Sequence, residues 1–182
     1  MSCCPPGSWP SLKSDHIRVG SVSCLGRGLS GYVVGSSDVG KAVIVIPDIF
    51  GIESGRTTSI CDQLADAGYF VVCPDVFRGD QWVNPVVDPE LLGPWLKTFP
   101  YEPVIRKEIY DITVPFITSK GISTIGLWGF CFGSWVIFKL CSDEKIAKTF
   151  KYGVVCNFNM YFDVLKTLLD LNILEFPSFH KN

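Results

Sequence analysis

The chain has 182 residues, of which 47% are hydrophobic and 19% are charged. A chain of this length and composition forms one globular domain with a substantial core. The net charge is -2, and the sequence has neither a cluster of Lys and Arg nor a nucleic-acid motif, which argues against nucleic acid as a partner. No apolar stretch is long enough for a membrane span or a signal-peptide core, so we expect a cytoplasmic protein without membrane contact.

Eight cysteines are spread along the chain without a C-x-x-C pair. Most of them fall in strand-like or helix-like segments, so we expect buried free thiols in a reducing compartment rather than disulfides. Cys3 and Cys4 adjoin each other, but no His or third Cys lies near them to complete a site for a soft metal. We expect neither a metal nor a cofactor.

The first third of the chain predicts an arm, a hairpin and a buried strand. Residues 1–15 are rich in Pro, Ser and Gly and are predicted to form a loose arm. Polar and apolar residues alternate in 16–19 and again in 31–34, which predicts an antiparallel hairpin at a sheet edge. Residues 41–47 are continuously apolar, as in a strand that is buried on both faces.

A repeating strand and helix pattern follows. Helical spacing over about 53–67 ends before Gly68, and 69–73 form the next buried strand. Residues 77–100 contain four prolines, which predict a long loop or lid. Its Trp82 and Trp95 are interpreted either as packing residues or as residues that stack on a substrate.

The second half of the chain adds two helices and two strands. Residues 102–119 have helical spacing, although Pro115 should kink or end that helix. A buried strand over 124–128 precedes a second apolar helix, and residues 152–156 form a short buried strand.

The strand at 124–128 and the helix after it enclose the sequence Gly129-Phe130-Cys131-Phe132-Gly133. Glycines two residues before and two after a nucleophile are typical of a nucleophile elbow, because a Cβ at either place would clash with the neighbouring helix and strand. The sequence therefore predicts an elbow whose nucleophile is the sulfur of Cys131. The N–H of Phe132 would lie free at a helix N-terminus, where it favours an adjacent anion.

Three segments of the sequence occur in a distinctive order and spacing: PDIFG at 47–51, GYFVVCPDVFRGD at 68–80 and GLWGFCFG at 126–133. Together they resemble the dienelactone hydrolase family of the α/β-hydrolase superfamily, and the likeness covers about 31–155. The resemblance implies an α/β fold with a mostly parallel sheet, helices on both faces and Cys131 at its carboxyl edge. It also implies hydrolysis of a small lactone or carboxylic ester by Cys131, with the N–H groups of Phe132 and Ile49 as the oxyanion hole.

The resemblance suggests roles for two further side chains. Asp48 matches an acidic residue that contacts the resting thiol, although the best-known bacterial members carry Glu there. The alternative for Asp48 is a carboxylate that caps the loop after its strand. Arg78 matches a position that binds a substrate carboxylate, and the alternative is a solvated loop arginine.

The partners of the nucleophile are missing from the sequence pattern. In the family an Asp and then a His follow the nucleophile, whereas this chain has only His16 and His180. Residues 157–182 predict one helix over 161–173 and a tail, so we expect an incomplete domain over 16–156 whose later strands are missing. A cysteine hydrolase and an inactive truncated remnant both remain open, as does a short member with His180 as base. A thiol redox protein is disfavoured because no resolving Cys adjoins Cys131 in sequence.

Overall fold

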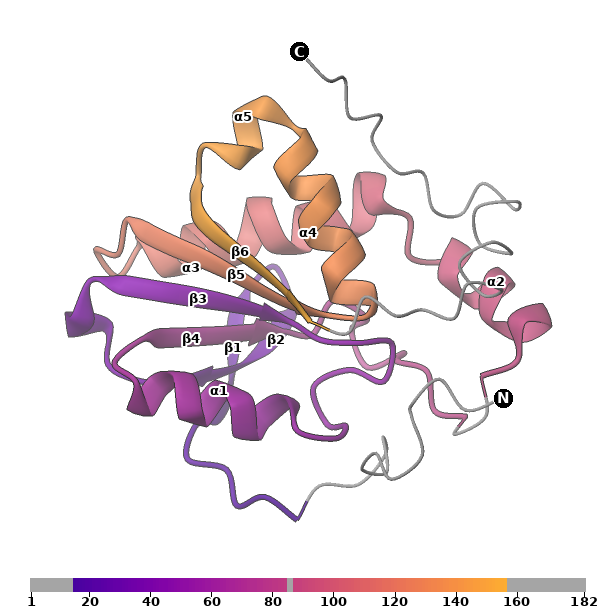
Figure 1. The fold of residues 1–182 in the computed structure, drawn as a ribbon, viewed down its shortest axis with the longest axis horizontal. Coiled ribbons are helices and arrows are strands. Elements are labelled where there is room, and N and C mark those ends of the chain that lie inside the picture. Colours follow the sequence, from indigo (N-terminus) through magenta and orange to yellow (C-terminus); the bar gives the residue numbers. More distant parts are fainter. Residues whose placement is uncertain (1–14, 85–86, 157–182) are drawn as a thin grey trace.

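The computed structural model describes residues 15–84 and 87–156 (Figure 1). The predicted arm, the predicted helix at 161–173 and His180 lie outside the described residues. In the described part of the chain, no helix has the length and apolar character needed to cross a membrane.

Within the described residues, six strands form one sheet in the order β1-β2-β4-β3-β5-β6. The strands β3, β4, β5 and β6 run parallel to one another, and β2 joins them antiparallel to β4 as part of a hairpin with β1. The strands are β1 Ser21–Gly26, β2 Leu29–Val34, β3 Lys41–Ile46, β4 Phe70–Pro74, β5 Thr124–Phe130 and β6 Phe150–Cys156. The predicted α/β architecture with a mostly parallel sheet is confirmed.

Helices lie on both faces of the sheet, with α1 in front of it and α3 behind it in the view of Figure 1. Three helical segments, η2, η3 and α3, connect the region after α2 to β5, and η2 is interrupted at Glu102 and Pro103, whose backbone angles are not helical. The helices are η1 Ser37–Val39, α1 Thr57–Asp66, α2 Pro89–Lys97, η2 Tyr101–Ile105, η3 Lys107–Thr113, α3 Val114–Thr118, α4 Phe132–Ser142 and α5 Glu144–Ala147.

The continuously apolar sequence of β3 is explained by burial on both faces of the strand. Ile44 and Ile46 pack in the larger core cluster, with buried residues of α3 and α4. Val43 and Val45 pack in a second cluster, which includes Cys61 of α1. Successive side chains of a strand point to opposite faces, so both cores draw on the same short segment.

The hairpin exists, but its first strand was predicted too early. Residues 16–19 are not a strand, and β1 begins at Ser21. Alternation of polar and apolar residues misled here because the side chain of His16 is held by Asp62 of α1 rather than by a strand neighbour. The second strand, β2, includes the predicted segment 31–34.

The first helix begins four residues later than predicted, at Thr57. A turn precedes it, in which Gly55 has a φ of +52° and the hydroxyl of Ser54 donates to the carbonyl of Gly51 at 3.1 Å. A hydroxyl that satisfies a local carbonyl competes with helix formation, which delays the start of α1.

The predicted loop at 77–100 contains a helix, α2. Asp88 caps it by accepting a hydrogen bond from the N–H of Glu90 at 2.9 Å, and Pro89 occupies the first turn. Proline is well tolerated there because its missing N–H would have no acceptor inside the helix. The prolines were therefore wrongly interpreted as breakers only.

The sequence predicted that Pro115 would kink or end its helix, and the helix does not end there. The turns before it are wide, and the N–H of Val114 donates to the carbonyl of Ile109, five residues earlier. Pro115 lies in the first turn of α3, so the chain stays helical as far as Thr118. Wide π-type turns before the proline accommodate its missing N–H.

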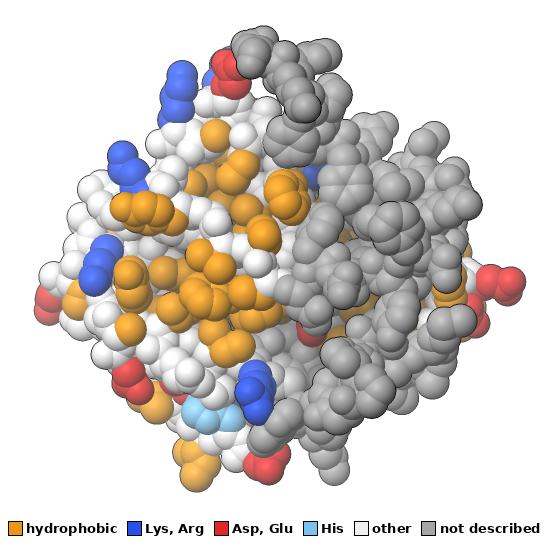
Figure 2. All heavy atoms as spheres, in the orientation of Figure 1, with side chains coloured by type: hydrophobic (Ala, Val, Ile, Leu, Met, Phe, Trp, Pro, Cys, Tyr) orange, Lys and Arg blue, Asp and Glu red, His pale blue; other side chains and the backbone are white. Residues whose placement is uncertain are grey.

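The last described strand, β6, lies at one edge of the described sheet, with β1 at the other, and its side chains are mostly exposed rather than buried as predicted. Tyr152 is 75% exposed, and Val154 and Val155 are also exposed. Figure 2 shows hydrophobic side chains gathered on the face that carries α1 in Figure 1. The apolar sequence of this strand therefore does not reflect burial among the described residues.

Candidate active site

The backbone at Cys131 has the strained conformation that the elbow requires. Cys131 lies between the last residue of β5 and the first residue of α4, with φ 49° and ψ -106°. Positive φ is uncommon for a residue with a Cβ and costs on the order of 1–3 kcal/mol. Such strain persists only where the surrounding structure enforces it.

The glycines on either side of Cys131 enforce it by letting the chain pass close to itself. A Cβ at Gly129 would lie 2.5 Å from the carbonyl atoms of Gly133. A Cβ at Gly133 would lie 2.2 Å from the carbonyl oxygen of Ile46, at the end of β3. Both approaches are shorter than any real Cβ contact, so only glycine fits at these positions.

The elbow is also bonded to the end of β6. The N–H of Cys131 donates to the carbonyl of Cys156 at 3.2 Å. The hydroxyl of Ser134, in the first turn of α4, lies 3.0 Å from the carbonyl of Gly129 and 3.1 Å from that of Cys156. Sequence reasoning missed both Ser134 and Cys156, and only a polar residue inside an otherwise apolar helix could have pointed to Ser134.

The two predicted oxyanion donors belong to adjacent segments. Phe132 is the first residue of α4, so its N–H is among those without an acceptor inside the helix. Ile49 follows β3, in which Ile46 is the Cα partner of Gly129. Because parallel strands end at the same edge of a sheet, the loop that carries Ile49 and the elbow share that edge.

Asp48 caps the loop after β3. Its Oδ1 accepts from the N–H of Phe50 at 2.9 Å and lies 3.3 Å from the hydroxyl of Ser54. Burial raises the pKa of Asp48 to about 6, although the hydrogen bonds from Phe50 and Ser54 oppose that rise. These contacts fit the capping alternative for Asp48 and leave contact with the thiol as a proposal.

Arg78 forms a forked ion pair within the protein. Its Nε and one terminal nitrogen each lie 3.0 Å from an oxygen of Glu108, whose side chain is almost fully buried. The two terminal nitrogens also donate to the carbonyl of Arg27 at 3.3 Å. Arg78 thus links the hairpin turn to η3, and its role towards a substrate carboxylate stays a prediction.

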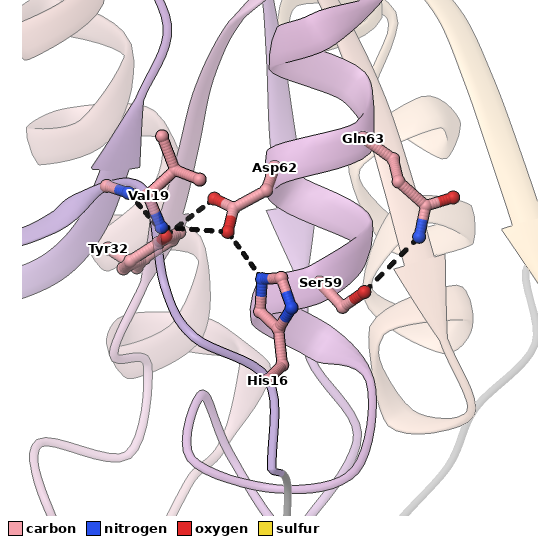
Figure 3. A network of polar contacts seen from close by, with 7 residues as sticks. His16, Val19, Tyr32, Ser59, Asp62 and Gln63 are labelled. Carbon is pink, nitrogen blue, oxygen red and sulfur yellow. Dashed lines mark hydrogen bonds and ion pairs between the residues drawn. The ribbon is translucent and has the colours of Figure 1, made fainter.

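His16 belongs to a polar network away from the elbow (Figure 3). Its Nε2 lies 2.6 Å from Oδ2 of Asp62, and the hydroxyl of Tyr32 donates to Oδ1 of Asp62 at 2.6 Å. Tyr32 is on β2, which β4 and β3 separate from β5. Three strand spacings correspond to about 14 Å, so the network is not the base of Cys131.

Aromatic side chains from the segment after β4 cover Phe132. The ring centroid of Phe77 lies 5.2 Å from that of Phe132 and 5.1 Å from that of Trp95. Trp82 packs edge-on against Trp95 at 5.6 Å and is only 8% exposed. These contacts favour the packing interpretation of the two tryptophans.

The cysteines are less uniformly buried than predicted. Cys61 and Cys73 are buried, Cys131 and Cys156 are partly exposed, and Cys24 and Cys141 are exposed; none of these six described cysteines forms a disulfide. Burial and the nearby thiol of Cys61 raise the pKa of Cys73 well above its ordinary value, which makes that thiol inert. Within residues 15–84 and 87–156, no group of three or more His, Cys, Asp or Glu is placed to hold a metal ion.

Comparison with known proteins gives consistent matches. The model of the dienelactone hydrolase family matches residues 29–158. A carboxymethylenebutenolidase homolog of Homo sapiens is 36% identical over 120 residues, which cover 65% of this chain and 49% of that protein. The homolog of Xenopus tropicalis is 31% identical over 137 residues, covering 73% and 54%. This chain therefore spans about half the length of these curated relatives.

Solved structures show the same fold. The crystal structure of a putative dienelactone hydrolase from Klebsiella pneumoniae has a TM-score of 0.59 and 19% identity, with 74% of this chain and 57% of that chain covered. A dienelactone hydrolase-like promiscuous phosphotriesterase from metagenomic libraries has a TM-score of 0.53 and 16% identity, covering 84% and 74%.

Proposed function

Because this chain belongs to the dienelactone hydrolase family, we propose that it acts on small lactones or carboxylic esters through the thiol of Cys131. The observation that carries this proposal is the positive φ of Cys131 between two glycines that admit no Cβ. Strain of this kind clusters at active sites, where it aims a nucleophile. The free cysteines suit a reducing compartment, and we propose the cytoplasm.

The chemistry would proceed through a thioester. The sulfur of Cys131 attacks the ester carbonyl carbon, and the carbonyl oxygen takes up the negative charge. The N–H groups of Phe132 and Ile49 donate to that oxyanion, near the positive end of the α4 dipole. Collapse expels the alcohol, and water then releases the acid and restores the thiol.

A second candidate function follows from the position of His16, which its partner Asp62 holds over β2. Acid–base assistance contributes a factor of about 10² to 10⁴ in rate, and His16 in this position does not supply it to Cys131. On this view the chain by itself is a catalytically inactive remnant that retains an intact elbow.

Hydrolysis of p-nitrophenyl acetate and of a small lactone by the wild type, Cys131→Ala and His180→Ala decides between the two. We expect turnover that depends on Cys131, and rapid labelling of Cys131 by iodoacetamide. Turnover that also vanishes in His180→Ala would identify His180 as the base. Labelling of Cys131 without any turnover would support the remnant, and turnover that survives Cys131→Ala would exclude the cysteine mechanism.

A further inference from the structure

The fold brings a second cysteine to the elbow from a distant part of the sequence. Phe130, the residue before the nucleophile, is the Cα partner of Cys156 in the parallel pairing of β5 with β6. The N–H of Cys131 then donates to the carbonyl of Cys156 at 3.2 Å. No second cysteine adjoins Cys131 in sequence, but the fold places the backbone of Cys156 next to it.

The separation of the two residues is compatible with a disulfide. A hydrogen bond of 3.2 Å between the two main chains, together with standard bond lengths, limits the distance between their Cα atoms to about 7 Å. Disulfides join residues whose Cα atoms are about 4.4–6.8 Å apart.

Exposure and position together set this pair apart from the other described cysteines. Cys131 and Cys156 are both partly exposed, whereas Cys61 and Cys73 are buried and therefore shielded from an oxidant. Cys24 and Cys141 are exposed, but they lie on β1 and near the end of α4. Among the described thiols, Cys156 is thus the accessible one whose backbone is bonded to the elbow.

We propose that Cys156 is a resolving thiol that captures oxidised Cys131 as a reversible disulfide. The sulfur of Cys131 attacks a hydroperoxide, the O–O bond breaks, and the products are the sulfenic acid of Cys131 and an alcohol or water. The sulfur of Cys156 then attacks that sulfenic sulfur and forms the S–S bond, and the sulfenic oxygen leaves as water. The hydroperoxide takes the two electrons, so atoms and charge balance.

The disulfide blocks the nucleophile and at the same time protects it. Sulfenic acid that is not captured is oxidised further to sulfinic acid, which thiols do not reduce. A disulfide is instead reopened by exchange with another thiol. This inference concerns the reactivity of the Cys131 thiol and does not depend on ester hydrolysis.

The wild-type chain tests the pairing directly. After treatment with hydrogen peroxide, the chain is alkylated, digested without reduction and mapped by mass spectrometry. We expect one peptide pair linking Cys131 to Cys156, no disulfide between two chains, and recovery of iodoacetamide labelling at both positions after dithiothreitol. Sulfinic acid at Cys131 without this linked pair, a link to a different cysteine, or a disulfide between two chains would overturn the proposal.

A matched pair of variants separates capture from simple oxidation. Cys156→Ser keeps the main-chain carbonyl that binds the elbow, and we expect Cys131 in this variant to pass irreversibly to sulfinic acid. Cys141→Ser removes an exposed thiol elsewhere on α4 and should behave as the wild type does. Equal recovery of Cys131 labelling in the wild type and Cys156→Ser would contradict a resolving role.

Discussion

At Gly133 the carbonyl oxygen of Ile46 occupies the space that any larger side chain would need. The conformation of the proposed nucleophile, Cys131, therefore depends on glycines, which carry no functional group but allow β3, β5 and α4 to meet at one point. Cys131 itself is unusual in its backbone conformation, which has a positive φ. The chemistry of the site is set by the main chain around the thiol as much as by the thiol.

Gly133→Ala should lower the free energy of unfolding by about 3 kcal/mol or more, because its Cβ would lie 2.2 Å from a backbone oxygen. Urea unfolding measures the change. Gly126→Ala, on β5, is the control, since the nearest neighbours of its Cβ would be 3.8 Å away, which is an ordinary contact. Equal stability of the two variants would remove the steric account of the elbow.

The buried carboxyl group of Asp48 should make the free energy of unfolding depend on pH. Burial raises its pKa to about 6 from 3.8, so the folded chain holds this proton more tightly than the unfolded chain does. The free energy of unfolding should therefore fall as the pH rises from about 4 to about 6, by a contribution on the order of 3 kcal/mol.

Asp48→Asn should abolish this contribution and make the chain more stable than the wild type at pH 7. The measurement is urea unfolding between pH 4 and pH 7, compared as wild type minus variant. Asp38→Asn, at an exposed position, should leave the slope unchanged. The same Asp48 variant should speed iodoacetamide labelling of Cys131 if the carboxylate meets the thiol.

The hydrogen-bond network around Asp62, drawn in Figure 3, joins the segment before β1 to β2 and α1. Burial raises the pKa of Asp62, but hydrogen bonds from Tyr32, His16 and the N–H of Val19 outweigh it, and the pKa is lowered overall. Burial together with the bond to Asp62 raises the pKa of Tyr32 to about 12. One carboxylate thus satisfies donors from three segments of the chain.

Asp62→Ala should cost about 1–3 kcal/mol of unfolding free energy, since it leaves the buried hydroxyl of Tyr32 without its acceptor. Asp66→Ala, one turn along the same helix and exposed, should change it little. Because the pKa of Asp62 is lowered by folding, its stabilisation is present above pH 4 and is lost as the pH falls further. A wild-type melting temperature in Asp62→Ala would show that the network is dispensable.

The elements differ in how far sequence could predict them. The strands β3 and β4 were predicted nearly to the residue, because a run buried on both faces has a composition that few other segments share. The helix α2 was missed because the position of Pro89 within a turn, not its presence, decides its effect. The elbow was predictable because its glycines are local in sequence. The contact of Cys131 with Cys156 was not, since it depends on the register between two strands.

Helices cover one face of the sheet unevenly along its strands. α1 packs with the residues of β2, β3 and β4 on one face, where Trp128 and Phe130 of β5 remain half-buried. The hydrophobic side chains in Figure 2 gather on this face. The outermost strand, β6, adds the exposed side chains of Tyr152 and Val154. An exposed apolar edge strand is a template for pairing with another chain.

This chain should therefore associate at high concentration, and Tyr152→Lys should reduce that association, because a charge on an edge strand opposes pairing. Sedimentation velocity over a range of concentrations measures it. Leu91→Lys changes an exposed apolar residue of α2, away from the edge, and should leave association as it is. A monodisperse wild-type monomer at high concentration would contradict this prediction.

The hydrogen bond from the N–H of Cys131 to the carbonyl of Cys156 also limits how long the elbow keeps its conformation. Outer strands open by local unfolding far more often than the middle of a sheet does. When β6 frays, the N–H of Cys131 and the hydroxyl of Ser134 lose the carbonyl of Cys156, and the strained φ of Cys131 loses one of its restraints. The time for which Cys131 keeps its strained conformation is then limited by local opening of β6, while the core stays folded.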